Sequence, residues 1–306
     1  MTETLQRKPK ILSDLVVLII SHNNADLILT VDTLDKYGYT GDWYIVLGND
    51  DAMYDEYVAR FGESRVLQFD KATVSDKFDH MDSVPLMNSA TYARNACFDI
   101  AKSLGYTYFM VLDDDYYEFQ FRYAEEGKLR ALYPTNLDVV FEVLLDYFKS
   151  VPTMKTLCIA QNGDFLGGVE GSHFKARCMR KAMNTFICST ERPFTFIGRL
   201  NEDVNTYCSL GARGDLFLTV MDVSINQNDT QQKNRRGGMR KGGLITPYTA
   251  DGTYCKSFYT VMCCPSFCKI GIIGNNHARI HHSIKWENAV PKIISDAYKK
   301  GASDNE

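Results

Sequence analysis

An apolar segment of this chain runs directly into three consecutive aspartates, and this junction restricts the folds open to it. Residues 106–112 are mostly aromatic or aliphatic, and Asp113, Asp114 and Asp115 follow without a break. An uninterrupted apolar run suits a strand that is buried on both faces of a sheet. Because burying unpaired carboxylates is costly, their place at a strand end indicates a cation, most simply Mg²⁺ or Mn²⁺. The alternative is a solvated acidic turn, in which Asp is also common.

The first half of the chain alternates apolar runs with helical patterns. This alternation predicts parallel βαβ units, and therefore an α/β fold. Ligands of such sheets bind at the carboxyl ends of the strands, which lie along one edge. Three predicted strands end in polar residues, at Ser21-His22-Asn23, at Asn49-Asp50-Asp51 and at the aspartate run, so we expect a nucleotide across them. The predicted strands are residues 15–21, 42–47, 65–69 and 106–112, the predicted helices are residues 26–37, 53–61 and 89–105, and residues 71–84 are a predicted loop.

The second half is less regular. Residues 137–149 have the pattern of an amphipathic helix. Short apolar runs predict strands at residues 157–159, 196–197, 217–221 and 257–262. Because no Pro/Ser-rich linker separates the halves, we expect one domain over residues 1–306, with a nucleotide-binding half at about 11–135 and an acceptor half at about 136–297.

The composition excludes several classes of protein. The chain has 306 residues, of which 45 % are hydrophobic and 24 % charged, as in ordinary globular proteins. Its longest apolar run is far shorter than a membrane span, and its N-terminus lacks the apolar core of a signal peptide. Nine cysteines without a disulfide framework favour a reducing cytoplasm. With a net charge of −4, any polyanionic partner must be bound by a local basic patch.

The residues at the strand ends resemble the nucleotide-sugar-binding part of GT-A glycosyltransferases. The resemblance rests on Ser21-His22-Asn23, on Arg94-Asn95 and on the strand that ends in Asp113-Asp114-Asp115. It implies a Rossmann-like, mostly parallel sheet flanked by helices, and a UDP-sugar donor held through Mn²⁺ or Mg²⁺. By the resemblance, Asp115 is the direct metal ligand, and Asp113 faces the metal, the ribose or the sugar. The residues assigned to donor binding are Ser21, His22, Asn23, Asn49, Asp50, Asp51, Arg94, Asp113 and Asp114.

A later acidic pair extends the resemblance. In many inverting GT-A enzymes a Glu-Asp pair at a helix start supplies the general base, and Glu202-Asp203 matches that pattern. A base must lie within hydrogen-bond reach of the acceptor hydroxyl. Asp203 is the candidate, with Glu202 as the alternative, and an Asp203 base implies inversion. The competing interpretation is acidic charge that merely offsets the helix dipole.

Two late histidines are candidate metal ligands. GT-A enzymes often complete the metal shell with a histidine late in the chain, and imidazole suits Mn²⁺. His281 and His282 alternate sides on an extended chain, so at most one of them faces the metal.

At the level of a family, the chain resembles the bacteriophage TET/JBP-associated glycosyltransferases. This resemblance rests on residues 92–95, the aspartate run, residues 198–203 and a basic loop followed by residues 274–276. Such enzymes are taken to glycosylate hydroxymethylated pyrimidines in phage DNA. The implied function is sugar transfer to 5-hydroxymethylcytosine or a similar base, in the cytoplasm of the host cell. The alternatives are a protein or glycan acceptor, or a non-catalytic module that binds nucleotides or DNA.

The basic loop bears on the acceptor. A flexible cationic loop in a mildly acidic protein can bind DNA phosphates, close over the donor as a lid, or simply be solvated. Arg199 is assigned to the same acceptor side. The cations of the loop are Lys233, Arg235, Arg236, Arg240 and Lys241.

Overall fold

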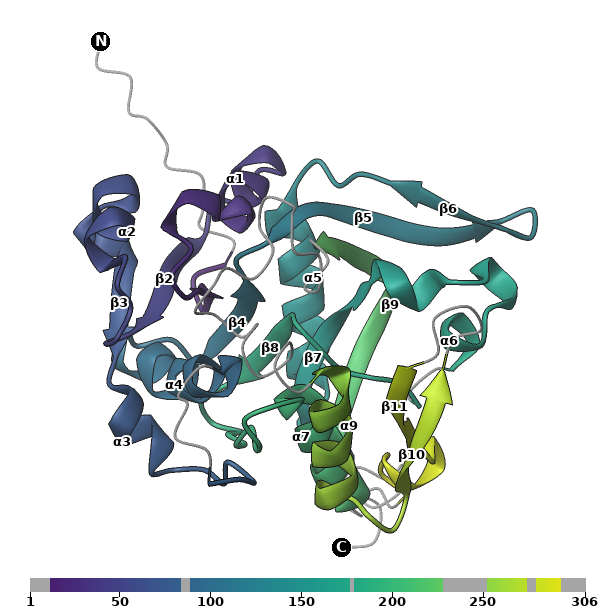
Figure 1. Ribbon diagram of the computed structural model, residues 1–306. Coiled ribbons are helices and arrows are strands. Elements are labelled where there is room, and N and C mark those ends of the chain that lie inside the picture. The colour runs from purple at the N-terminus through teal and green to yellow at the C-terminus, as the bar shows by residue number, and fades with distance from the viewer. Residues whose placement is uncertain (1–11, 84–88, 177–178, 228–251, 274–278, 293–306) are drawn as a thin grey trace, which may run out of the picture.

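A nine-stranded sheet, in the order β3-β2-β1-β4-β8-β7-β9-β5-β6, forms the centre of the molecule (Figure 1). The structure is a computed structural model that describes residues 12–83, 89–176, 179–227, 252–273 and 279–292. A separate hairpin of two strands, β10 and β11, lies beside it.

The first four strands pair in parallel, as the alternating pattern predicted. β1 pairs with β2 on one side and with β4 on the other, and β2 pairs with β3. Every residue of β1 is buried, as expected of a parallel strand between two helical layers. The α/β prediction is therefore confirmed. The strands are β1 (Leu15–Ile20), β2 (Asp42–Gly48), β3 (Val66–Phe69) and β4 (Tyr108–Asp113).

The helices of this half agree with the sequence except at residues 71–84, where the predicted loop contains a short helix. The Asp70 side chain accepts a hydrogen bond from the Thr73 backbone N–H at 2.6 Å, which caps that helix. The longest helix begins after Ser89, whose hydroxyl accepts from the Thr91 N–H. The helices are α1 (Leu29–Lys36), α2 (Tyr54–Phe61), α3 (Lys71–Ser75) and α4 (Ala90–Ser103), with short 3₁₀ helices η1 (Ala25–Leu27) and η2 (Glu63–Arg65).

The remaining strands extend the same sheet with mixed pairing. β8 is antiparallel to β4 and to β7, β9 is parallel to β7, and the β5–β6 hairpin is antiparallel to β9. The sheet therefore crosses the expected boundary near residue 135. The elements are β5 (Tyr116–Glu125), β6 (Lys128–Leu132), α5 (Leu137–Ser150), β7 (Met154–Gln161), η3 (Asn162–Phe165), η4 (Gly168–Glu170), α6 (Ser172–Lys175), β8 (Phe186–Ser189), α7 (Glu202–Ala212), β9 (Leu216–Gln227), α9 (Gly252–Cys263), β10 (Cys268–Ile273), β11 (Arg279–Ile284) and η5 (Trp286–Asn288).

Two strand predictions in this half are wrong. Residues 257–262 lie in α9, which packs against α7 and β11, so tertiary packing overrides their β-propensity. Residues 196–197 are not in a strand, because the Asn95 side chain satisfies both backbone groups of Phe196, at 2.8 and 3.0 Å.

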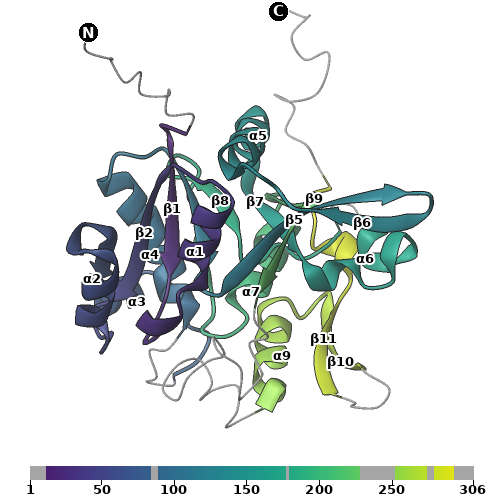
Figure 2. The same cartoon turned by 90° about the horizontal axis from the view of Figure 1, so that it is seen from above.

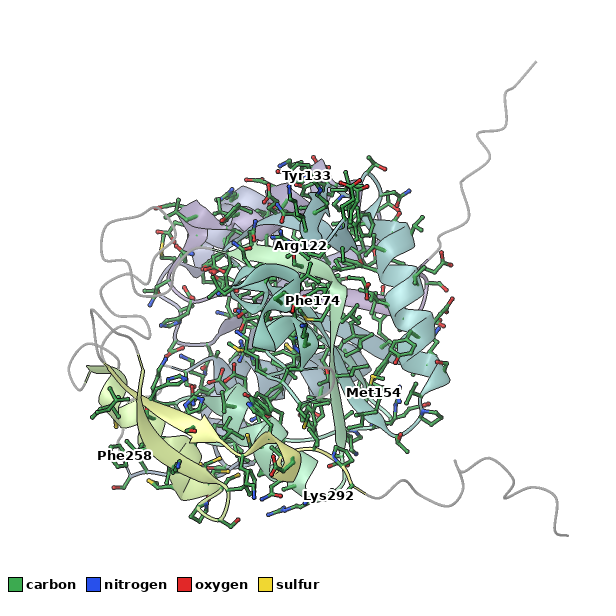
Figure 3. The ribbon with its side chains drawn as sticks, turned by 90° about the vertical axis from the view of Figure 1, so that its right-hand side faces the viewer. Arg122, Tyr133, Met154, Phe174, Phe258 and Lys292 are labelled. Atoms are coloured by element: carbon green, nitrogen blue, oxygen red, sulfur yellow. The ribbon has the colours of Figure 1, made fainter. Side chains whose placement is uncertain are left out.

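Helices cover both faces of the sheet (Figure 2). Val16 and Leu18 of β1 face a core shared with α4 and α7, and Val17 and Ile19 face a core shared with α1 and α5. Over β5, the Arg122 guanidinium lies 4.9 Å from the Phe165 ring, and that ring contacts Phe174 of α6 (Figure 3). None of the helices in the described part of the chain is long and apolar enough to cross a membrane.

Candidate active site

The three strands whose polar ends were predicted to share one sheet edge do end together. In β1, Ile20 pairs with Val46 of β2 and with Asp113 of β4, so these three parallel strands end at the same level. The chain order reverses direction between β1 and β4, which is the kind of switch point where α/β sheets bind ligands. The sequence-based prediction of a shared edge is borne out by this register.

Asp114 is held by the end of β1. Its carboxylate accepts hydrogen bonds from the Ser21 hydroxyl and from the Asn24 amide, the latter at 3.0 Å. The Tyr57 hydroxyl steadies both partners, at 2.7 Å from the Ser21 oxygen and 2.9 Å from the Asn24 backbone nitrogen. Burial raises the pKa of Asp114 to about 6 despite these hydrogen bonds. Asp114 therefore joins β1 to β4.

Asp115 has a buried oxygen that lacks a partner. The residue is 8 % exposed, and its Oδ1 has no hydrogen-bond partner among the described residues. Burial, together with the charges of Asp113 and Asp114, raises its pKa to about 9. A divalent cation would bind the unpaired oxygen and favour the ionised form of Asp115, so this carboxylate fits the predicted role of a metal ligand.

The protein supplies few ligands for such a cation. Among the described residues, no group of three or more His, Cys, Asp or Glu side chains is placed to hold a metal ion. Mg²⁺ is commonly bound through one or two carboxylates, with water and substrate phosphates completing its shell. The carboxylates after β4 suit that mode of binding.

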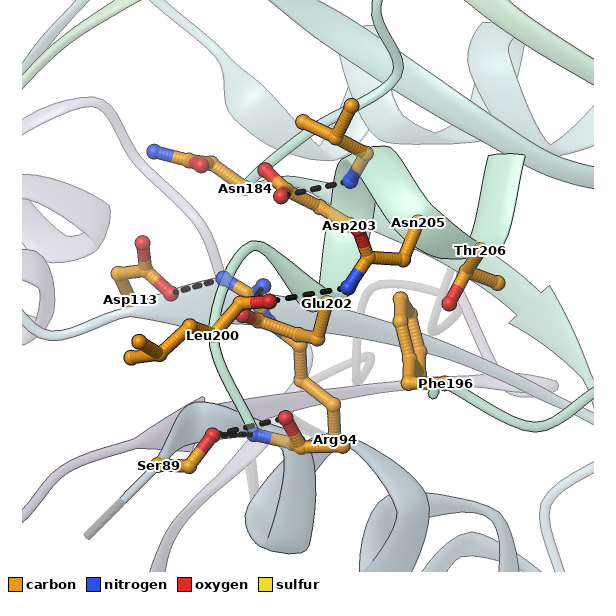
Figure 4. Close-up of polar contacts among 12 residues, drawn as sticks. Ser89, Arg94, Asp113, Asn184, Phe196, Leu200, Glu202, Asp203, Asn205 and Thr206 are labelled. Carbon is orange, nitrogen blue, oxygen red and sulfur yellow. Dashed lines mark hydrogen bonds and ion pairs between the residues drawn. The ribbon is translucent and has the colours of Figure 1, made fainter. Parts of the chain in front are cut away.

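Arg94 joins the two acidic groups of the site (Figure 4). This α4 residue is 4 % exposed, and its guanidinium donates to Asp113 Oδ1 at 3.2 Å and to Glu202 Oε1. Burial raises the pKa of Asp113, and Arg94 opposes that rise. Burial likewise raises the pKa of Glu202 to about 7. Arg94, which the sequence assigned to donor binding, uses at least two of its hydrogen bonds to hold carboxylates.

Asp203 is the second residue of α7 and, unlike Glu202, takes no part in the ion pairs of Arg94. Its Oδ1 accepts from the Val204 backbone N–H at 2.7 Å (Figure 4). The loop before α7 is fixed by α4, because the hydroxyls of Ser89 and Thr91 donate to the backbone oxygens of Arg199 and Gly198. Glu202 is thus paired with Arg94, whereas the described hydrogen bond of Asp203 is to the backbone at the start of its own helix.

The residues after β1 and β2 are bound to each other. The Asn23 N–H donates to Asp51 at 2.8 Å, and the Ala52 N–H donates to Asn23 Oδ1 at 3.0 Å. His22 Nδ1 lies 3.5 Å from Asp51. Although burial opposes it, hydrogen bonds from His22, Asn23 and Met53 lower the pKa of Asp51. These side chains form a preorganised edge beside Asp114.

Asn49 and Asp50 point to a different neighbour. Asn49 donates to Asp70 at 2.8 Å, and Asp50 forms an ion pair with Lys71 at 2.7 Å. These contacts join the end of β2 to the start of α3, whereas Asp51 contacts the end of β1.

The late histidines meet the start of α7. The rings of His281 and His282 stack at 4.2 Å, and His282 Nδ1 accepts from the Asn201 amide at 3.3 Å. Burial lowers the pKa of His282 to about 3, so its imidazole is neutral. The partner of His282, Asn201, directly precedes Glu202 in the chain.

Arg199, which the sequence assigned to the acceptor side, is buried and paired within the protein. It is 4 % exposed and forms a two-pronged ion pair with Asp82, at 3.0 and 2.6 Å, and it donates to the Tyr259 hydroxyl. It therefore anchors the loop before α7. The five cations of the basic loop lie outside the described residues.

Sequence reasoning missed a group of amide side chains near the same edge. Asn184 and Gln161 both donate to Gln227 Oε1, the latter at 3.3 Å. Gln161 and Gln227 end β7 and β9, which run parallel to β4. The rule that polar residues end strands would have found them, had the predicted strands been extended to their full length.

Comparisons with known proteins give a family match. A family model described as TET-associated glycosyltransferase matches residues 15–238. Among solved structures, glucosyl-3-phosphoglycerate synthase from Mycobacterium tuberculosis, in complex with Mg²⁺ and UDP, is 11 % identical, with a TM-score of 0.44 over 88 % of this chain and 87 % of that one. A mannosyltransferase from Pyrobaculum calidifontis, in complex with GDP-Man and Mn²⁺, is 15 % identical, with a TM-score of 0.44 over 72 % of this chain and 58 % of that one. A comparison with curated protein sequences finds no match.

Proposed function

Because the chain belongs to the family of TET-associated glycosyltransferases, we propose that it transfers a sugar from a UDP-sugar to the hydroxyl of 5-hydroxymethylcytosine, or a similar hydroxymethylated base, in DNA. That it is a glycosyltransferase follows from the family; the donor, the metal and the acceptor are the proposal. Members of this family are taken to modify phage DNA, which would place the reaction in the cytoplasm of the host.

The observation that carries the proposal is the pairing of two acidic groups through Arg94. One group follows β4 and leaves an oxygen of Asp115 without a partner, and the other begins α7 and leaves Asp203 outside the Arg94 ion pairs. A sugar transfer needs both kinds of group: one to hold the charged leaving group through a cation, and one to take the acceptor proton.

The residues that would hold Mn²⁺ or Mg²⁺ are Asp115 and Asp113. When bound, the metal neutralises charge that develops on the departing diphosphate. Asp114 would keep its place between Ser21 and Asn24, so that it orients the strand end. The UDP moiety would lie along the edge formed by His22, Asn23 and Asp51.

The transfer itself would invert the anomeric carbon. The bond from that carbon to the diphosphate oxygen breaks, and UDP leaves with the bonding electrons. A bond forms between the same carbon and the hydroxymethyl oxygen of the base, whose proton passes to Asp203. Placing the base at the start of a helix fixes it relative to the acceptor.

For the acceptor, support comes from the family and from charge. The protein is acidic overall, so phosphate binding would rest on the basic loop at residues 233–241, which is proposed either to bind DNA or to close over the donor. A base inside a duplex would have to be flipped out or reached in a groove.

A mass spectrum of nucleosides tests the proposal. DNA with and without 5-hydroxymethylcytosine is incubated with UDP-glucose, UDP-N-acetylhexosamines and a UDP-pentose such as UDP-arabinose, with Mn²⁺ or with EDTA. We expect a mass gain of one sugar on the hydroxymethylated nucleoside only, abolished by EDTA. Equal transfer to unmodified DNA, or transfer to protein alone, would refute the acceptor.

A further inference from the structure

Two amide side chains on neighbouring strands share one carboxylate. Glu118 of β5 pairs with Asn226 of β9, and its Oε2 accepts from Gln120 Nε2 at 2.7 Å and from Asn226 Nδ2 at 2.5 Å. Because a carboxylate only accepts hydrogen bonds, it fixes both amides with their NH₂ groups toward it. Both amide carbonyl oxygens must therefore point elsewhere.

These carbonyl oxygens are buried without a partner. Gln120 and Asn226 are each 8 % exposed, and neither Gln120 Oε1 nor Asn226 Oδ1 has a hydrogen-bond partner among the described residues. Buried carbonyl groups normally accept a hydrogen bond. Two unpaired carbonyl oxygens on amides that share one carboxylate therefore need an explanation. A ligand that brings N–H or O–H donors would supply it.

The pair lies close to the aspartate run. Phe119 and Ile225 face the core shared with α1 and α5, so by strand alternation Gln120 and Asn226 face the opposite side, the side of the sheet on which Arg122 contacts Phe165 of η3. Glu118 comes three residues after Asp115, a distance of ~10 Å along a strand. Tyr116, next to Asp115, pairs with Gln227, next to Asn226, so the end of β9 lies beside the start of β5.

We propose that Gln120 and Asn226 read the amino group of the acceptor cytosine, and that Glu118 positions them. This inference rests on the proposed function. The cytosine amino group offers two N–H donors and sits on the ring carbon next to the one that bears the hydroxymethyl group. Reading it therefore also places the hydroxyl that receives the sugar. Uracil carries a carbonyl oxygen at that position, which two carbonyl acceptors repel.

Matched oligonucleotides with 5-hydroxymethylcytosine or 5-hydroxymethyluracil at one position test the wild-type enzyme. We expect kcat/KM to be higher for the cytosine by on the order of tenfold or more. An oligonucleotide with N4-methylated 5-hydroxymethylcytosine should also lose activity, since one N–H donor is gone. These arms need no variant, so a variant that fails to fold leaves the proposal testable.

Variants then assign the residues. Gln120→Met and Asn226→Leu should bring the ratio of the two rates toward one, while KM for the UDP-sugar and UDP release without acceptor stay unchanged. Glu118→Gln should have the same effect, because it frees the amides to turn. Gln68→Met, at an exposed position of β3, is the matched control and should leave the ratio at the wild-type value.

Several results would overturn the inference. Equal rates on the two bases with wild-type enzyme would remove its premise, and an unchanged ratio in the variants would remove its residues. A raised KM for the UDP-sugar with an unchanged ratio would mean that the amides read hydroxyls of the donor. If wild-type enzyme modifies neither base, the proposed function itself fails and this inference falls with it.

Discussion

The two acidic groups of the site, the run Asp113–Asp115 and the pair Glu202–Asp203, are buried or half-buried but differ in the partners that the protein gives them. In each group, one member is held by Arg94, Asp113 in the first and Glu202 in the second. Asp114 is held by Ser21 and Asn24. Asp115 has an oxygen, Oδ1, that has no hydrogen-bond partner among the described residues.

This difference distinguishes carboxylates that stabilise the fold from carboxylates that are available for the reaction. A carboxylate that is paired inside the protein stabilises the fold around it, and removing its partner is costly. A buried carboxylate without a partner is a standing cost that only a ligand relieves. We therefore expect the partnered residues to govern stability and positioning, and Asp115 and Asp203 to govern the reaction.

The largest effect on activity should come from Asp115→Asn. The amide keeps the shape of the side chain but loses the charge that would bind the cation, so we expect transfer to fall by ~10³-fold. Nucleoside mass spectrometry with UDP-sugar and Mn²⁺ measures the loss. The matched control is Asp222→Asn, at an exposed position of β9, which should retain activity.

The same substitution should leave stability intact or raise it. The pKa of Asp115 is about 9 in the folded state and lies near its ordinary value of 3.8 when unfolded, so the folded state binds the extra proton. Stability of the metal-free protein should therefore fall as pH rises from about 4 to about 9, and the Asn variant should show a shallower fall. Thermal unfolding across that range measures it, and an equally steep fall in the variant would contradict the assignment.

Asp203→Asn should be the next largest change. Loss of a general base typically lowers the rate by about 100-fold or more, so kcat should drop while KM for the UDP-sugar stays near the wild-type value. Glu202→Gln is the comparison, since it alters the neighbouring carboxylate of the same helix. A larger loss of kcat in the Glu202 variant would exchange the roles of the two residues.

Arg94→Met should act mainly on stability. It leaves Asp113 and Glu202 buried without their cation, which costs about 3–5 kcal/mol in the free energy of unfolding. Lys77→Met removes one side of an exposed ion pair with Asp99, where the expected loss is only ~0–1 kcal/mol. Urea unfolding of both variants measures the two losses in the free energy of unfolding. Equal losses would show that the ion pairs of Arg94 stabilise the fold no more than an exposed ion pair does.

Much of the site follows from local sequence, because polar residues at the ends of apolar strands mark the ligand edge of a parallel sheet. That rule pointed to Ser21, Asp51 and the aspartate run, whereas Asp203 was assigned from the resemblance to GT-A enzymes. These signals need only neighbouring residues, since strand and helix periodicity are local properties.

The rest depends on contacts between distant parts of the chain. Arg94 pairs with Glu202, 108 positions further on, and no local pattern encodes that contact. Arg199 has the composition of a surface cation, yet Asp82 and the packing of α9 bury it. The Gln120–Asn226 pair escaped notice because the β5–β6 hairpin and the end of β9 were not predicted, so neither residue had a place in the sheet.

The smallest expected effect is that of Tyr57→Phe, which tests whether Asp114 is architectural. The Tyr57 hydroxyl contacts both residues that hold Asp114, so its loss should lower the free energy of unfolding by ~1 kcal/mol and raise KM for the UDP-sugar severalfold, with kcat nearly unchanged. Tyr147→Phe, at an exposed position of α5, is the control and should change neither value. If Tyr57→Phe lowered kcat as strongly as Asp115→Asn, Asp114 would belong with the reacting carboxylates, and the division drawn between the partnered and the unpartnered groups would fail at that residue.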